Sequence, residues 1–147
     1  MKLPHTLFAL PFALVGMLGA SHIAPITPAT VLWIVVAFSA ARFAAMGFNR
    51  IVDRGFDAEN PRTARREIPT GTIRVGAARV AVVVASALFV VASRMLNPLC
   101  FYLSPIALFW VLGYSYTKRF TVWPHLWLGL GLGIAPVGGW LAVTGAW

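Results

Sequence analysis

Five apolar stretches alternate with short polar connections along the chain. They cover residues 3–20, 31–48, 80–92, 98–114 and 123–147. Because an α-helix rises about 1.5 Å per residue, about 20 apolar residues cross the apolar core of a bilayer, which is about 30 Å thick. The pattern therefore predicts an all-α protein, a polytopic transmembrane bundle with about five helices.

Composition supports a membrane protein and excludes several other classes. Hydrophobic residues make up 59% of the chain and charged residues 11%, whereas a soluble domain carries about a quarter charged residues. The net charge of +8 would suit nucleic acid, but the apolar stretches indicate the lipid bilayer as the partner and no nucleic acid. Cys100 is the single cysteine, which excludes a disulfide framework or a cysteine-rich zinc site.

The basic residues alternate between the connections. Lys2 precedes the first stretch, residues 21–30 carry no Lys or Arg, and seven arginines lie between Arg50 and Arg79. Arg94 follows alone, and Lys118 and Arg119 come next. By the positive-inside rule, we expect the N-terminus and the polar loop of about residues 49–74 to face the cytoplasm.

All four carboxylates of the chain fall within residues 53–67. Asn49, Asp53 and Asp57 follow one another at four-residue steps, a spacing that keeps side chains on nearly one face of a helix. An amide and two carboxylates are hard oxygen ligands of the kind that Mg²⁺ takes together with phosphate oxygens. The spacing predicts a magnesium site at Asn49, Asp53 and Asp57.

Basic side chains surround this predicted site. Arg42 lies within an apolar stretch and seven positions before Asn49, and a buried arginine in a bilayer marks a functional cavity or a charged partner. Arg50 and the arginines of the following loop offer guanidinium groups suited to phosphate. A second interpretation stays open for the basic residues between Arg62 and Arg79, which are also typical of a solvated, salt-bridged surface or of a contact with anionic lipid.

The segment Asn49-Arg50-x-x-Asp53-x-x-x-Asp57, followed by Asn60-Pro61-Arg62-Thr63, resembles the first aspartate-rich motif of the UbiA family of intramembrane prenyltransferases. It is most similar to the branch that prenylates 4-hydroxybenzoate. Residues 114–120, Tyr-Ser-Tyr-Thr-Lys-Arg-Phe, look like the basic motif that follows the fourth helix in this family.

The resemblance implies nine transmembrane helices around a central cavity and two aspartate-rich motifs that hold Mg²⁺ against a polyprenyl diphosphate. About five of these helices and the first motif are present, so residues 1–147 are expected to be the N-terminal part of such a membrane domain. The resemblance also implies catalytic roles for Arg42, Asp53 and Asp57. Diphosphate binding is implied for a set of five residues: Arg42, Asn49, Arg50, Lys118 and Arg119.

The function implied is transfer of a polyprenyl group to 4-hydroxybenzoate or a similar aromatic acceptor in ubiquinone biosynthesis, at the inner membrane of a bacterium. A naphthoate, a haem or a chlorophyll precursor stays open as the acceptor. The alternative is an inactive fragment or a non-enzymatic membrane protein whose basic loop binds anionic lipid. Phosphatidyltransferases with paired aspartates are excluded, because Ala41-Arg42 lacks their upstream Asp-Gly and Asn49 replaces their glycine.

Residues 129–139 are rich in glycine without matching a nucleotide-binding loop. Ile134 and Pro136 stand where the last glycine of that motif would be. We expect Gly129 and Gly133, four residues apart, to allow close helix packing.

Overall fold

A computed structural model describes residues 3–120 and 124–146, with the side chains of residues 10–117 and 125–146. This part of the chain forms helices without strands. The helices are α1 (Leu3–Ala20), α2 (Pro28–Val52), α3 (Arg54–Glu59), α4 (Val75–Leu96), α5 (Pro98–Phe120) and α6 (Pro124–Thr144).

The predicted all-α fold is confirmed, and each predicted apolar stretch corresponds to a long helix. Four of these helices are long and apolar enough to cross a membrane by length and composition, and Leu10–Ala20 of α1 is a shorter apolar segment. Helix α2 begins earlier than predicted because Thr27 caps it: the Thr27 hydroxyl accepts a hydrogen bond from the Thr30 N–H at 3.1 Å. Pro28 then occupies the first turn, where its missing N–H costs nothing.

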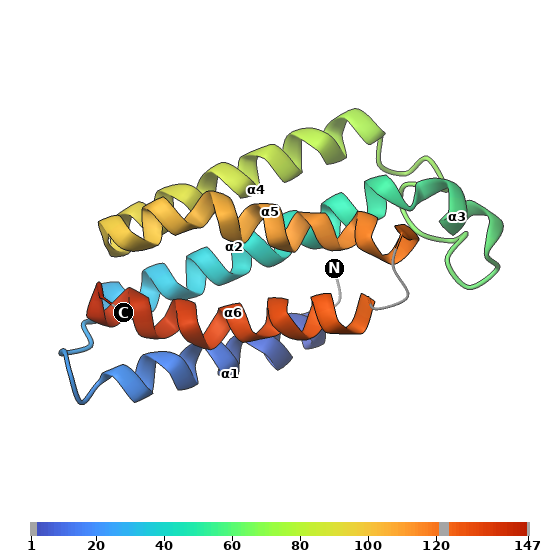
Figure 1. The fold of residues 1–147 in the computed structure, drawn as a ribbon. Helices are drawn as coiled ribbons and strands as arrows, with labels where there is room; N and C mark the ends of the chain where they lie inside the picture. The colour runs from blue at the N-terminus through green and yellow to red at the C-terminus, as the bar shows by residue number, and fades with distance from the viewer. Residues whose placement is uncertain (1–2, 121–123, 147) are drawn as a thin grey trace.

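The long helices run side by side in two groups (Figure 1). Helices α2, α4 and α5 form one group, and α1 packs mainly against α6. Helix α3 and the loop of residues 60–74 project from one end of the bundle, called here the α3 end (Figure 1). The loop joins α3 to the start of α4, so this end gathers the polar segment of the sequence.

Helices α1 and α6 approach each other through glycines. A Cβ added at Gly16 would overlap the carbonyl oxygen of Pro136, and one added at Gly139 would overlap the carbonyl oxygen of Ala13. The predicted packing through Gly129 and Gly133 is wrong for the described part of the chain, because a Cβ at either position would meet none of its atoms within 4 Å. Small residues permit close contact only on the face turned toward a partner helix.

Polar groups also join the helices. At the end of the bundle opposite α3, the Asn97 side chain donates to the Leu141 carbonyl oxygen at 2.8 Å and accepts from the Cys100 N–H at 2.8 Å. Between α5 and α6, the rings of Trp110 and Trp127 stack with centroids 3.9 Å apart. Each indole N–H donates to the backbone carbonyl of the other tryptophan. The contacts of Leu141 and Trp127 fix α6 against its neighbours at two levels of the bundle.

Large apolar side chains cover the outer surface of the bundle. On α4 and α6, exposed side chains include those of Val80, Val83, Val84, Leu88, Val91, Leu126, Leu128, Leu130 and Val137. A water-soluble protein rarely exposes so extended an apolar surface, whereas helices that face lipid do. The polar groups at the α3 end are therefore placed at the edge of an apolar body.

Candidate functional site

The three predicted metal ligands lie in one row that crosses the junction of α2 and α3. Asp53 ends α2 and precedes α3, with φ −84° and ψ 0°. The Asp53 N–H donates to the Asn49 carbonyl oxygen at 2.9 Å, and the Asp57 N–H donates to the Asp53 carbonyl oxygen at 2.8 Å. These bonds retain the four-residue helical step across the break between the two helices.

Both aspartates are buried, although they lie at the polar end of the bundle. Asp53 is 8% exposed and Asp57 is 7% exposed, and Asn49 is partly buried. Aspartate is rarely buried without a partner, because removing a charge from water is costly. The site therefore holds two carboxylates in a place where a positive charge stabilises them.

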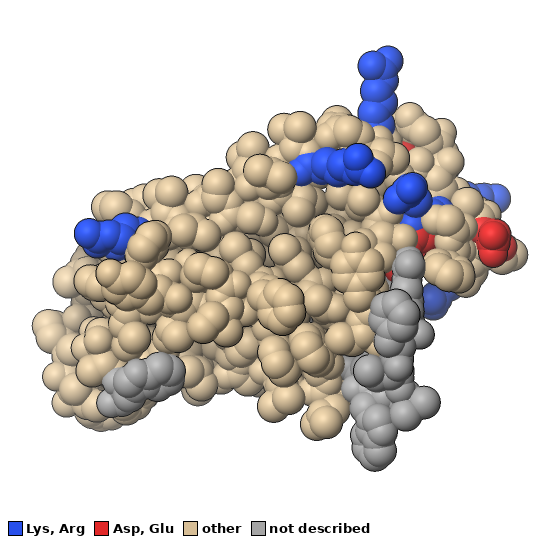
Figure 2. Space-filling view, turned by 45° about the horizontal axis from the view of Figure 1, so that its top comes forward, with Lys and Arg blue, Asp and Glu red and all other residues tan. Residues whose placement is uncertain are grey.

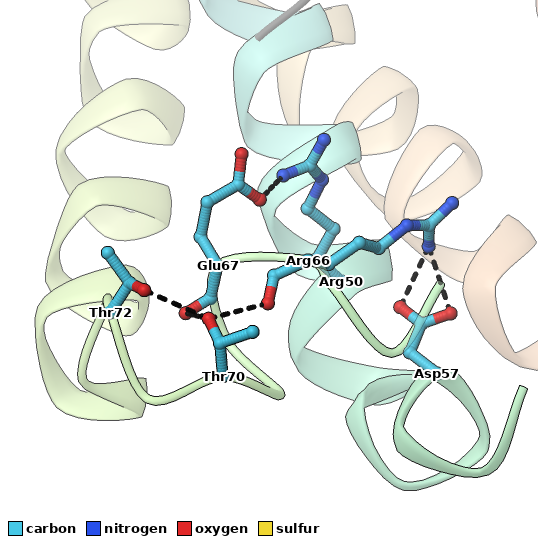
Figure 3. A network of polar contacts seen from close by, with 6 residues as sticks. All are labelled: Arg50, Asp57, Arg66, Glu67, Thr70 and Thr72. Carbon is cyan, nitrogen blue, oxygen red and sulfur yellow. Dashed lines mark hydrogen bonds and ion pairs between the residues drawn. The ribbon is translucent and has the colours of Figure 1, made fainter. Parts of the chain in front are cut away.

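Arg66 supplies such a charge to Asp57. Its Nη1 donates to Oδ1 at 2.9 Å and to Oδ2 at 2.7 Å, and Figure 3 shows the guanidinium group reaching back over α3 from the loop. The sequence left two interpretations of Arg66 open, phosphate binding and a salt-bridged surface, and it did not single out Asp57 as the partner. The sequence contains one indication of this contact. Asn60-Pro61 is typical of a turn, and a reversal of the chain there brings the following loop back toward α3.

Hydrogen bonds within the loop fix that reversal. The Asn60 side-chain oxygen accepts from the Arg62 N–H at 3.0 Å, and the buried Thr63 hydroxyl donates to the Asp57 carbonyl oxygen at 3.0 Å. Farther along, the Thr70 hydroxyl donates to the Arg66 carbonyl oxygen at 2.9 Å. Gly71 has φ +74°, a conformation that favours glycine. The loop is thus a folded unit built around α3.

Arg50, a predicted diphosphate-binding residue, pairs with Glu67 (Figure 3). The pKa of Glu67 lies below its ordinary value of 4.5 because of a hydrogen bond with its own backbone, with a further contribution from Arg50; partial burial opposes the shift. The ion pair connects the last turn of α2 to the loop. It also orients Arg50 at the α3 end.

We expect Glu67→Gln to loosen the loop at neutral pH and to have no effect in acid. Since the folded-state pKa lies below the unfolded value, the ion pair stabilises the loop above about pH 4.5 and its contribution disappears as the pH falls through the folded-state pKa. The Glu67 side chain is 43% exposed, which limits the effect to under about 1 kcal/mol, or about fivefold.

Hydrogen exchange of residues 60–74, corrected for the intrinsic rate at each pH, measures this effect. Glu59→Gln is the control, because Glu59 is exposed and makes no ion pair within the described part of the chain. Equal loss of protection in Glu67→Gln at pH 7 and at a pH well below the folded-state pKa would show that the carboxylate charge is not the cause.

Arg42 lies on α2 about two turns before Asn49. Its Nε is buried and has no hydrogen-bond partner among the described residues. An unmade hydrogen bond of a buried charged group carries a large desolvation penalty. A bound anion would supply the missing acceptor, as predicted for this arginine.

Lys118 and Arg119 are two further predicted diphosphate ligands. They fall in the last turn of α5, and their side chains lie outside the described residues. The positions remain predictions from the sequence.

The donor set of the row fits Mg²⁺ completed by phosphate. No group of three or more His, Cys, Asp or Glu that could hold a metal occurs in the described ranges. Mg²⁺ is commonly held by one or two carboxylates plus phosphate and water oxygens, and Asp53 and Asp57 supply two buried carboxylates. A carboxylate has about four acceptor positions, so the Arg66 nitrogen at Asp57 leaves room for a cation.

Positive charge gathers around this row. Figure 2 shows most Lys and Arg side chains at one end of the molecule, with the tan body almost free of charge. Seven of the 12 basic residues of the chain lie between Arg50 and Arg79. This arrangement attracts a polyvalent anion to the α3 end.

Comparison with known proteins agrees with these features. Residues 9–147 match the UbiA prenyltransferase family. The structure resembles the apo structure of a UbiA homologue from Aeropyrum pernix K1, with a TM-score of 0.91 and 36% identity, over 99% of this chain and 52% of that chain.

The chain is similar to proteins that are named for different activities. A polyprenyl transferase of Arthrobotrys oligospora is 32% identical, over 96% of this chain and 41% of the relative. A protoheme IX farnesyltransferase of Methylococcus capsulatus is 37% identical, over 91% of this chain and 46% of the relative. A 4-hydroxybenzoate octaprenyltransferase of Aromatoleum aromaticum is 37% identical, over 71% and 35% respectively.

The chain thus spans less than half the length of these relatives. The family match nevertheless covers most of the helical bundle and the segment that holds the aspartates. Together with the fold, this match shows that the chain belongs to the UbiA prenyltransferase family.

Proposed function

We propose that this chain forms the diphosphate-binding part of an intramembrane prenyltransferase, which moves a polyprenyl group from its diphosphate to an aromatic acceptor. The observation that carries the proposal is the row of Asn49, Asp53 and Asp57, with two buried carboxylates at the end of an apolar bundle. The buried Arg42 Nε without a partner among the described residues supports it.

The residues of the row would hold Mg²⁺ through one amide oxygen and carboxylate oxygens. When bound, the metal ion supplies Lewis-acid stabilisation of the diphosphate leaving group. As the bond between the prenyl carbon and the diphosphate oxygen breaks, negative charge grows on the diphosphate. In this proposal Arg42 would donate to that charge from α2 inside the bundle, and Arg50 from the last turn of α2.

The apolar bundle suits the isoprenoid tail of the substrate. An isoprenoid tail is hydrocarbon and partitions into the bilayer next to the helices. Exclusion of water from the reacting carbon protects an allylic cation until the acceptor ring attacks it. A diphosphate site at the edge of an apolar body suits a molecule with a charged head and a long apolar tail.

We propose 4-hydroxybenzoate as the acceptor, which places the reaction in ubiquinone biosynthesis. The support is the motif of residues 49–63 and the similarity to 4-hydroxybenzoate octaprenyltransferases, one of which is from Citrobacter koseri and 37% identical. The protoheme IX farnesyltransferases among the relatives make a haem the competing acceptor.

The orientation proposed places the α3 end on the cytoplasmic side of a bacterial inner membrane. The support is the excess of arginine between Arg50 and Arg79, which the positive-inside rule assigns to the cytoplasm. Polyprenyl diphosphate would then meet the aspartate row from the cytoplasmic surface.

Binding of farnesyl diphosphate to the chain in lipid nanodiscs tests the proposal. We expect binding that needs Mg²⁺, that is lost with EDTA and that exceeds the binding of farnesol. Membranes containing the chain are then given labelled prenyl diphosphate with 4-hydroxybenzoate or with protohaem, to identify the acceptor. Binding that is unchanged by EDTA, or equal binding of farnesol, would overturn the proposed diphosphate site.

A further inference from the structure

A groove lies at the α3 end, and none of the three residues of the aspartate row lines it. It is an open groove of about 510 Å³ between α2, α4 and α5. Its apolar walls are Phe48, Ile51, Val52, Val82 and Val83. Asn49, Asp53 and Asp57 do not line it, so it is separate from the proposed diphosphate site.

Polar side chains complete the groove: Arg54 from α3, Arg79 from α4 and Tyr116 from α5. Both arginines are exposed, and neither pairs with a carboxylate among the described residues. Arg54 donates to the Ile51 carbonyl oxygen at 3.1 Å, which is an uncharged partner. By contrast, Arg50 and Arg66 each pair with an acid. The groove thus combines two exposed positive side chains with an apolar wall.

The groove is also at the right level for a lipid headgroup. Arg79 lies in the second turn of α4, and beyond it Val80, Val83 and Val84 form part of the exposed apolar surface. Arginine near the end of a membrane helix places its charge at the headgroup level. Tyrosine is also enriched at that level, and the Tyr116 ring packs edge-on against Phe48 with centroids 5.8 Å apart.

We propose that the groove binds one anionic phospholipid. Its headgroup phosphate lies between Arg54 and Arg79, and one acyl chain lies along Val82 and Val83. An anionic phospholipid fits this groove for two reasons. Its phosphate complements the positive charge at the polar rim, and its acyl chain suits the apolar wall, which continues into the lipid-facing surface of α4. The substrate diphosphate is the poorer fit, because the carboxylates that would hold its metal ion line a different part of the α3 end.

Native mass spectrometry of the purified chain with equal amounts of phosphatidylglycerol and phosphatidylcholine tests the proposal. We expect retention of one phosphatidylglycerol in preference to phosphatidylcholine. A basic residue near an anionic lipid surface contributes about 1 kcal/mol, so Arg79→Gln and Arg54→Gln are each expected to weaken retention about fivefold. Arg94→Gln removes the same charge at the opposite end of α4 and is expected to change nothing.

A second pair of variants tests the apolar wall. Val83→Trp fills the groove, whereas Val84→Trp adds the same bulk to a neighbouring exposed position outside the groove. We expect only Val83→Trp to reduce phosphatidylglycerol retention. Circular dichroism of each variant checks that the helices persist.

Three results would overturn the proposal. They are equal retention of the two phospholipids, an equal effect of Arg79→Gln and Arg94→Gln, and complete displacement of phosphatidylglycerol by millimolar inorganic phosphate. The last would mean that the arginines bind a free phosphate ion instead of a lipid.

Discussion

Asp53→Asn is expected to abolish magnesium-dependent binding of farnesyl diphosphate by the chain in nanodiscs. Asp53 is the central member of the row and is 8% exposed. Asparagine keeps the shape of the side chain and the backbone N–H that bonds to Asn49, but it removes the negative charge that a cation needs. Loss of a buried charged partner costs about 2–5 kcal/mol, which weakens binding about 30-fold or more.

Glu59→Gln is the matched control for this prediction. Glu59 ends α3, is exposed and carries the same charge outside the row. We expect its variant to bind farnesyl diphosphate like the unaltered chain. If both variants lose affinity to the same extent, general charge at the α3 end determines binding and the row has no special part in it.

Gly16→Ala is expected to have the largest effect on stability. The added Cβ would overlap the backbone carbonyl of Pro136, which cannot move aside as a flexible side chain can. Alanine favours a helix over glycine by about 1 kcal/mol, and overpacking of this kind costs about 1–3 kcal/mol or more. Because the contact is with backbone, we expect the loss to dominate and α1 to separate from α6.

Unfolding of the chain in mixed micelles, followed by circular dichroism, measures the change in free energy. Gly129→Ala is the control on α6, because a Cβ there would meet nothing within 4 Å. It is expected to be neutral or slightly stabilising. If Gly16→Ala and Gly129→Ala behave alike, the close approach of α1 and α6 does not contribute to stability.

The apolar stretches of the sequence predicted the long helices well, because length and hydropathy decide which segments are helical in a bilayer. It did not predict which glycines pack. Gly129 and Gly133 have the usual spacing, but Gly16 and Gly139 make the close contacts. The arrangement of all the helices determines which face of α6 contacts α1. The sequence of α6 alone therefore does not predict which of its glycines pack.

The candidate site likewise has one feature that local sequence determines and one that it does not. The four-residue helical step of Asn49, Asp53 and Asp57 follows from backbone geometry and persists across the junction of α2 and α3, whereas their role as metal ligands stays a prediction. The ion pair of Arg66 with Asp57 depends on the path of the loop after Asn60, where several short hydrogen bonds must act together. Local turns of this kind are indicated by the sequence, but their side-chain partners are not.

The pairing of α1 with α6 also bears on how the protein is made. The partner of Gly16 comes 120 residues later in the chain, and ribosomes add about 5–20 residues per second, so this partner is synthesised roughly 6–24 seconds afterwards. During that interval α1 lacks the helix that it packs against in the folded protein. Helix α1 is therefore synthesised well before the neighbour that its glycine face contacts.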